Sequence, residues 1–179
     1  MKHALIAFVL ILATVPAIAQ DDYSPNNTFS IGLALNADSM GIGLGYYNTS
    51  FNDSFGFYIN STIDFTAPVD DIETQDYPWF SWHNAVETKY EHYIFNGGLV
   101  VKAADMMLFY GGIGCAAMQG VTHYQSEVSN LNYWVYDSDY TFDVNFNGGA
   151  ILKFSSSFGI DGGFNSSSKG GYVNLAFSF

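Results

Sequence analysis

The sequence predicts an all-β fold, a closed eight-stranded antiparallel transmembrane β-barrel with up-and-down topology. Three observations predict it. Apolar and polar residues alternate at period two in eight segments. The composition is 49% hydrophobic and 18% aromatic but only 12% charged, which excludes a disordered chain. Short and long links also alternate along the chain, as they do between the two ends of such a barrel.

The N-terminal residues predict a secretory signal peptide. A basic start with Lys2 is followed by an apolar run over 4–13 and by a small-residue site that ends at Ala19. The apolar run is shorter than the roughly 20 residues that a membrane-spanning helix needs. We therefore expect a signal peptide over 1–19 and a barrel domain over 20–179.

The first three strands are expected near 28–36, 40–48 and 54–65. In the first, Phe29 to Leu35 contribute an apolar residue at every odd position, with Ser, Gly and Ala between them. The second alternates Met, Ile, Leu and Tyr with glycine and one tyrosine. The third places Phe and Ile opposite Gly, Tyr, Asn, Thr and Asp. Each pattern is typical of a strand with one apolar face.

The next two strands, near 90–102 and 107–118, have noisier patterns. In the fourth strand, Ile94 and Val100 interrupt an otherwise polar face. In the fifth strand we expect Cys115, the only cysteine, to face outward and Tyr110 to face inward. Because the chain has one cysteine, no intramolecular disulfide can form.

The last three strands are expected near 141–154, 157–165 and 170–179, and they alternate regularly. Phe, Val and Leu residues oppose Asp, Asn, Gly and Lys. The predicted strand lengths are close to the roughly 9 to 11 residues with which a tilted strand crosses a bilayer. Two of the remaining links are long, 66–89 and 119–140. They lie at the same end of the barrel as the tight turns 37–39 and 166–169, and we expect them to form outer loops.

Size and charge indicate which face points outward. The interior of an eight-stranded barrel has room only for a filling of side chains. Glycine and small polar residues fit that space, whereas the 16 phenylalanines do not. Exposing them to water would cost about 25 cal/mol for each Å². We therefore expect the apolar face to contact lipid, and the barrel to be closed so that every backbone amide has a partner.

The C-terminal strand ends in Phe179 and has hydrophobic residues at alternate positions before it. This ending resembles the assembly signal of bacterial outer-membrane barrels, and the chain as a whole resembles a small eight-stranded barrel of the OmpA/OmpX type. The resemblance implies export to the outer membrane of a Gram-negative cell. It also implies contact with outer-membrane lipid and lipopolysaccharide, and recognition of the last strand by the barrel-assembly machinery.

Polar residues on the predicted inner face form the first candidate site. They are Asp64, His92, Asn96, Lys102, Asp143, Asn145, Asn147, Lys153 and Asp161. In a narrow lumen they would form a hydrogen-bonded, partly ion-paired plug, with the lysines at the inner end and Asp64 and Asp143 near the outer end. The alternative is a narrow, cation-selective pore. We favour the plug, because eight strands leave little room for a continuous water path.

A second candidate lies where the fifth strand enters its outer loop. His123, Ser126 and Glu127 include the residue types of a hydrolase in which histidine activates a serine hydroxyl. The set resembles that of outer-membrane lipid A deacylases, which are also eight-stranded. Glu127 is adjacent to Ser126, however, where the orienting acid would normally come from elsewhere. A surface histidine without a catalytic role is therefore preferred.

The two long links hold aromatic and acidic residues. The aromatic residues include Trp79, Trp82 and Trp134, which have tyrosines close to them in the sequence. They are expected to form either a contact surface or part of the aromatic girdle at the membrane interface. The acidic cluster 70–76 lacks the spacing of a calcium loop, so no metal and no cofactor are predicted.

The net charge of −12, with no arginine, argues against binding to nucleic acid. The function predicted from these features is a structural or surface-contact role through the two outer loops. The lipid A hydrolase and the narrow pore are the alternatives.

Overall fold

The structure is a computed structural model that describes residues 26–36, 39–50, 54–65, 83–126 and 132–179. The predicted signal peptide, the acidic cluster 70–76, Trp79, Trp82 and Glu127 lie outside the described residues. Five side chains at the ends of long strands are also outside the description, among them that of Ser126.

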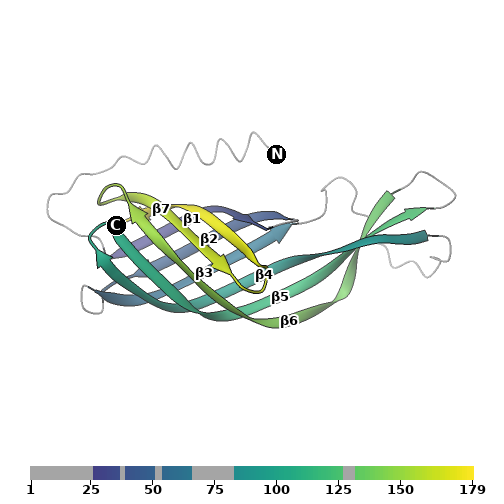
Figure 1. Cartoon of the computed structure of the whole chain (residues 1–179), viewed down its shortest axis with the longest axis horizontal. Coiled ribbons are helices and arrows are strands. Elements are labelled where there is room, and N and C mark those ends of the chain that lie inside the picture. Colours follow the sequence, from purple (N-terminus) through teal and green to yellow (C-terminus); the bar gives the residue numbers. More distant parts are fainter. Residues whose placement is uncertain (1–25, 37–38, 51–53, 66–82, 127–131) are drawn as a thin grey trace.

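The described residues form eight antiparallel strands, as predicted. They are β1 (Asn27–Leu35), β2 (Met40–Asn48), β3 (Phe55–Phe65), β4 (His83–Ala104), β5 (Met107–Ser126), β6 (Asn132–Lys153), β7 (Phe158–Asn165) and β8 (Gly170–Ser178). Each strand pairs with the next, and β1 pairs with β8 from Thr28–Ser178 to Leu35–Gly171. The ring is therefore closed, and the up-and-down topology is confirmed (Figure 1).

Three strands extend well beyond their predicted ends. β4 begins at His83 rather than near 90, β5 continues to Ser126 rather than 118, and β6 begins at Asn132 rather than near 141. The predicted outer loops 66–89 and 119–140 are thus largely replaced, in the described part, by a projecting sheet (Figure 1). Above the membrane neither face of a strand meets lipid, so the alternation that marks a lipid-facing strand is not required there.

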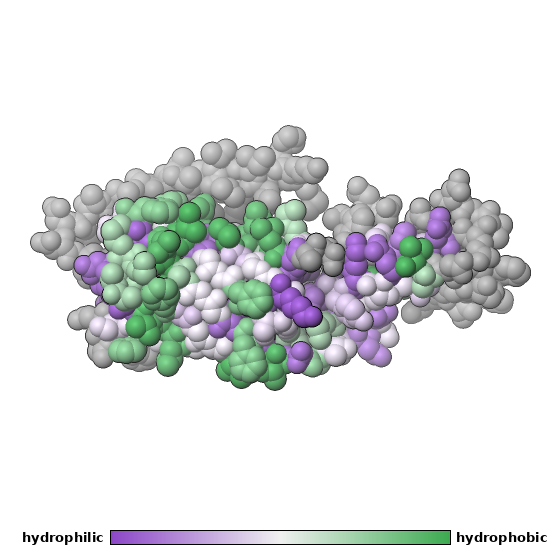
Figure 2. Space-filling view, viewed as in Figure 1, coloured by the Kyte–Doolittle hydropathy of each residue, from purple (hydrophilic) through white to green (hydrophobic). Residues whose placement is uncertain are grey.

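The outer face of the barrel is apolar, as the alternation predicts. Phe57, Leu99, Ile113, Phe146 and Val173 are exposed on five different strands. In Figure 2 hydrophobic residues gather over the barrel, and hydrophilic residues are concentrated towards the projecting end.

The two noisier strands follow the predicted sides. Cys115 is exposed on β5, while Tyr110 is buried. Ile94 and Val100, which interrupt the polar face of β4, are also buried in the barrel interior. Among the described residues, no helix has the length and apolar character to cross a membrane.

Candidate functional site: an occluded lumen and a projecting sheet

The middle of the lumen is built around one fully buried carboxylate, that of Asp161 on β7. Tyr110 Oη donates to Asp161 Oδ1 at 2.6 Å. Asp161 Oδ2 accepts hydrogen bonds from Ser30 Oγ at 2.6 Å, from Tyr47 Oη at 2.8 Å and from Asn174 Nδ2 at 3.2 Å. Four donors from four strands therefore converge on one charge, which is how a buried anion is satisfied without a cation.

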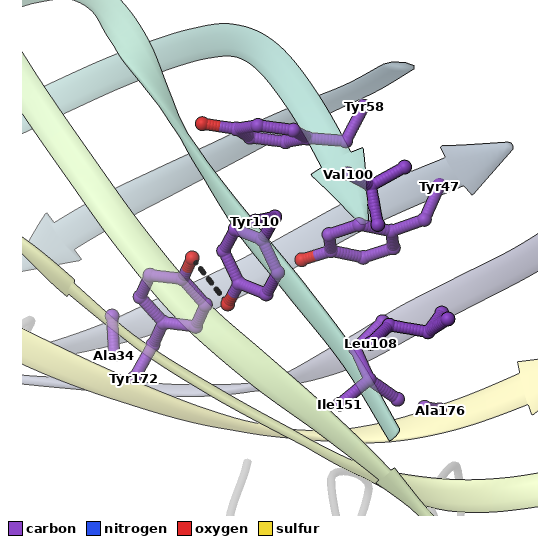
Figure 3. Packing of buried hydrophobic residues seen from close by; sticks show 9 residues of the cluster. All are labelled: Ala34, Tyr47, Tyr58, Val100, Leu108, Tyr110, Ile151, Tyr172 and Ala176. Atoms are coloured by element: carbon purple, nitrogen blue, oxygen red, sulfur yellow. Dashed lines mark hydrogen bonds between the residues drawn. The ribbon is translucent and has the colours of Figure 1, made fainter. Parts of the chain in front are cut away.

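Four tyrosine rings fill the space around this carboxylate. The rings of Tyr47 and Tyr58 stack at 5.7 Å, and that of Tyr110 lies 4.9 and 5.1 Å from them. Tyr110 Oη and Tyr172 Oη share a hydrogen bond of 2.9 Å (Figure 3). All four residues are buried.

Side-chain amides form a second cluster beside the tyrosines. Asn145 Nδ2 donates to Asn96 Oδ1 at 2.6 Å and to Asn165 Oδ1 at 3.0 Å. Asn96 Nδ2 donates in turn to Asn60 Oδ1 at 2.8 Å, and Asn165 Nδ2 to Thr62 Oγ1 at 3.1 Å. The amides thus bind one another across the lumen from β3, β4, β6 and β7.

Tyr172 joins the two clusters. Its hydroxyl accepts from Asn60 Nδ2 at 2.8 Å and from Asn147 Nδ2 at 3.1 Å, and Tyr58 donates to Asn147 Oδ1. The interior is therefore one continuous hydrogen-bonded network.

The predicted inner-face residues occupy three zones. Asp161, Asn96, Asn145 and Asn147 belong to the network described above. Asp64, near the outer end of β3, accepts from Asn36 and lies 3.7 Å from His92 Nδ1. Lys102 and Lys153 lie towards the inner end, with Lys153 buried and Lys102 Nζ 2.9 Å from Asp105 Oδ1. The hydrogen bond and charge of Lys102 hold the pKa of Asp105 below its usual value.

Asp143 is separate from these zones. It is exposed, because β6 continues past the end of β7 and, among the described residues, no strand pairs with this part of β6 on that side. Its carboxylate accepts the backbone N–H of Val144 at 2.7 Å.

The network includes residues that were not among the candidates. They are Ser30, Asn60, Thr62, Asn165, Asn174 and the four tyrosines. Each lies on the inward face that the alternation defines, so this signal was present in the sequence.

The projecting sheet contains β4, β5 and β6 beyond the ring. The imidazole of His123 stacks on the indole of Trp134, with ring centroids 4.8 Å apart and planes at 19°. Lys89 Nζ lies 5.5 Å from the centroid of the same ring and 3.4 Å from Glu87 Oε1. Trp134 is only 8% exposed, so this candidate aromatic residue packs within the sheet. No group of three or more His, Cys, Asp or Glu residues in the described part has a geometry that could hold a metal ion.

A closed ring with an outward apolar belt and an interior filled by side chains defines a small, occluded, membrane-spanning β-barrel. Solved structures of Ail, the attachment invasion locus protein of Yersinia pestis, are similar to this chain. Two of them, one in complex with the heparin analogue sucrose octasulfate, have TM-scores of 0.57 and 0.56 at 15% identity. A third, of the outer membrane protein in a phospholipid bilayer nanodisc, has a TM-score of 0.50 at 18% identity.

Each of these matches covers 87% of this chain and 99% of Ail. At this level of identity the likeness shows the fold, which is that of eight-stranded outer-membrane barrels. No protein-family model matches the sequence, and no curated protein matches it.

The packing of the lumen predicts its electrical behaviour. In planar bilayers we expect the wild-type barrel to give no current above that of bare lipid, because rings and amides occupy its cross-section. Tyr110→Ala removes a ring that contacts Tyr47 and Tyr58 and should allow small, cation-favouring currents past Asp161. Stable current steps from the wild-type protein would contradict the occluded lumen.

The position of His123 allows a test of the hydrolase alternative. We expect mass spectrometry to find the same lipid A acyl chains in cells that express wild type or His123→Ala, because the imidazole stacks on Trp134. Loss of an acyl chain in wild-type cells alone would restore the catalytic hypothesis.

Proposed function

We propose that the protein is a non-enzymatic outer-membrane surface protein that contacts partners through its projecting sheet. The lengths of the strands support this most directly. β4, β5 and β6 have 20 to 22 residues, whereas the other five have 8 to 11. About 9 to 11 residues are enough to cross a bilayer. The additional strand length therefore has no role in spanning the membrane and is available for contact.

The proposal includes processing and assembly. Removal of the signal peptide 1–19 would leave 20–179 as the barrel domain. Phe179, 64% exposed at the end of the last strand, would be read by the barrel-assembly machinery. The apolar belt would contact outer-membrane lipid, and the outer rim would lie beside lipopolysaccharide.

The charge of the sheet favours some partners over others. Asp137, Asp139 and Asp143 are all exposed on β6. The only lysine of β6, Lys153, lies at the opposite end of that strand. An anionic sugar of the kind bound to Ail would be repelled by these carboxylates. We therefore expect the partners of this chain to differ in charge from that ligand.

The proposal is tested by removing the upper hairpin. Met118 and Thr141 face each other across β5 and β6, so an Asn-Gly turn can join them in place of 119–140. Bacteria displaying the trimmed barrel should lose at least about fivefold in retention on glass coated with extracellular-matrix proteins. Surface amount and heat-modifiable gel migration control for assembly. Equal retention of both proteins would remove the contact role.

A further inference from the structure

The inner mouth of the lumen collects side chains that donate hydrogen bonds. Because neighbouring strands are antiparallel, the start of β1 and the ends of β6 and β8 lie at the same end of the barrel. Thr28, Lys153 and Ser178 occupy these positions on the inward face, and they are 1%, 8% and 7% exposed. We call these three residues the inner-mouth cluster.

Lys153 carries a charge that no described residue neutralises. Among the described residues, no hydrogen bond or ion pair partners its ammonium group. Lys102 acts on it with a charge of the same sign. Taking an ammonium group out of water without a partner is costly. The surroundings of Lys153 therefore favour the binding of an anion.

A hydroxyl proton at the same end also lacks an acceptor. Thr28 Oγ1 and Ser178 Oγ share a hydrogen bond of 2.9 Å. Such a bond uses one of the two hydroxyl protons and leaves the other available. Within the described part of the chain, neither hydroxyl has a second acceptor. The strand between this pair and Lys153 is β7, and its residue opposite the lysine is Gly159, which has no side chain to separate them.

An apolar layer separates the inner-mouth cluster from the buried carboxylate of Asp161. Val100, Leu108 and Ile151 are buried on the inward face, and Leu108 pairs with Ile151 across β5 and β6 (Figure 3). Ile151 precedes Lys153 by two residues and so lies one step deeper in the lumen. A partner for Lys153 therefore has to enter from the inner end.

The donors of the inner mouth match a carboxylate. Lys102 Nζ is already paired with Asp105 at 2.9 Å, which leaves Lys153 as the unpaired cation in the described part of this end. A carboxylate brings one negative charge and two acceptor oxygens, one for the ammonium group and one for the remaining hydroxyl proton. A phosphate group carries about −1.5 to −2 at neutral pH and would keep excess negative charge.

We propose that the inner-mouth cluster binds a carboxylate that enters from the periplasmic end of the barrel. Lys153 pairs with its charge, and the Thr28–Ser178 pair donates one hydrogen bond to it. The site lies at the opposite end from the projecting sheet, so it goes beyond the proposed contact role and does not depend on it. Two sources could supply the carboxylate: a separate molecule, or Asp21 and Asp22, which precede β1 in the sequence.

The test uses the full barrel in nanodiscs of zwitterionic phospholipid, with ¹³C-labelled lysines observed by NMR. The signal that is lost in Lys153→Met is assigned to Lys153. We expect this signal to shift saturably as sodium acetate is added, and not with sodium chloride at equal ionic strength. The signal of Lys89, which lies beside Glu87 on the projecting sheet, should not move in either titration.

Paired variants separate the hydroxyl donor from simple attraction between charges. Thr28→Val with Ser178→Ala should weaken acetate binding about tenfold, the effect of losing one hydrogen bond to a charged group. Thr88→Val with Thr122→Val removes a hydroxyl pair of the same kind, at 3.0 Å on the projecting sheet, and should leave binding unchanged. Heat-modifiable gel migration verifies that each variant is assembled.

Asp21→Asn with Asp22→Asn identifies the source of the carboxylate. If a separate molecule is the ligand, this variant and the wild type bind acetate equally. If the chain's own carboxylates occupy the site, the variant shifts the Lys153 signal before acetate is added and binds acetate more tightly than the wild type does.

Three results would overturn the proposal: no saturable shift in either protein, an equal effect of chloride, or unchanged affinity after loss of both hydroxyls. Tighter binding of inorganic phosphate than of acetate would also overturn it, because the donors would then not select a carboxylate. Retention on coated glass is measured independently of these titrations, so failure here leaves the contact role of the projecting sheet intact.

Discussion

Asp161→Ala is expected to destabilise the barrel by about 3–5 kcal/mol, because each buried donor that is left without an acceptor costs about 1–3 kcal/mol. The substitution leaves the hydroxyls of Tyr47, Tyr110 and Ser30 without their acceptor. Tyr110 retains Tyr172 and the Gly162 carbonyl, at 2.9 and 3.2 Å, and so loses least. Urea unfolding from lipid vesicles, followed by tryptophan fluorescence, measures the change.

Asp143→Ala is the matched control for that measurement. It also removes an aspartate from a position that the alternation predicts to face inward. Asp143, however, is exposed and accepts one local hydrogen bond. We expect a change within about 0.5 kcal/mol, as for most exposed substitutions. If the two variants unfold at the same urea concentration, Asp161 does not organise the lumen.

The ring of strands could be predicted because lipid imposes a strict pattern on sequence. A residue such as Phe57 or Val173 must be apolar where it meets hydrocarbon, and its neighbours must be small or polar to fit the interior. The projecting sheet is free of that constraint. His123 and Trp134 form a cross-strand pair beyond the lipid-facing part of the barrel. There either face of a strand accepts polar and aromatic residues alike, so no alternation predicts these two residues.

The sequence predicts which side chains face the interior, but it does not predict which of them contact one another. Alternation places Asn60 and Tyr172 on the inward face, yet it does not say that they meet. Which inward residues meet across a barrel depends on the tilt and stagger of its strands. That quantity is a property of the whole ring, and no single segment of sequence carries it.

The inward glycines show how the rings are accommodated. A Cβ built on Gly112 would lie 2.6 Å from Tyr58 Oη, and one on Gly45 would lie 2.7 Å from Tyr47 Oη. Cβ positions on Gly149 and Gly163 would likewise collide with Tyr110 and Tyr172. Each tyrosine thus lies against a glycine of another strand or of its own. The tyrosines and glycines are two halves of one packing arrangement, which predicts a large effect when either half is changed.

Gly112→Ala is accordingly expected to destabilise the barrel by at least about 3 kcal/mol or to prevent its assembly, at the upper end of overpacking effects. The new Cβ would lie 2.7 Å from Gly98 Cα and still closer to the Gly97 carbonyl oxygen. Both are backbone atoms of β4, so no rotation of a side chain relieves the clash. β4 and β5 would have to separate, at the cost of hydrogen bonds in their ladder.

Gly111→Ala is the matched control because the two residues are adjacent and face opposite sides. Its Cβ would point outward, with its nearest neighbour the Asn147 carbonyl oxygen at 3.8 Å. We expect it to be neutral or to stabilise the fold by about 0.5 to 1 kcal/mol through the smaller entropy of the unfolded chain. Heat-modifiable gel migration and urea unfolding compare the two variants. Equal stability would mean that the strands are not held at the spacing that this packing requires, and the tyrosine-filled lumen would then lose its main support.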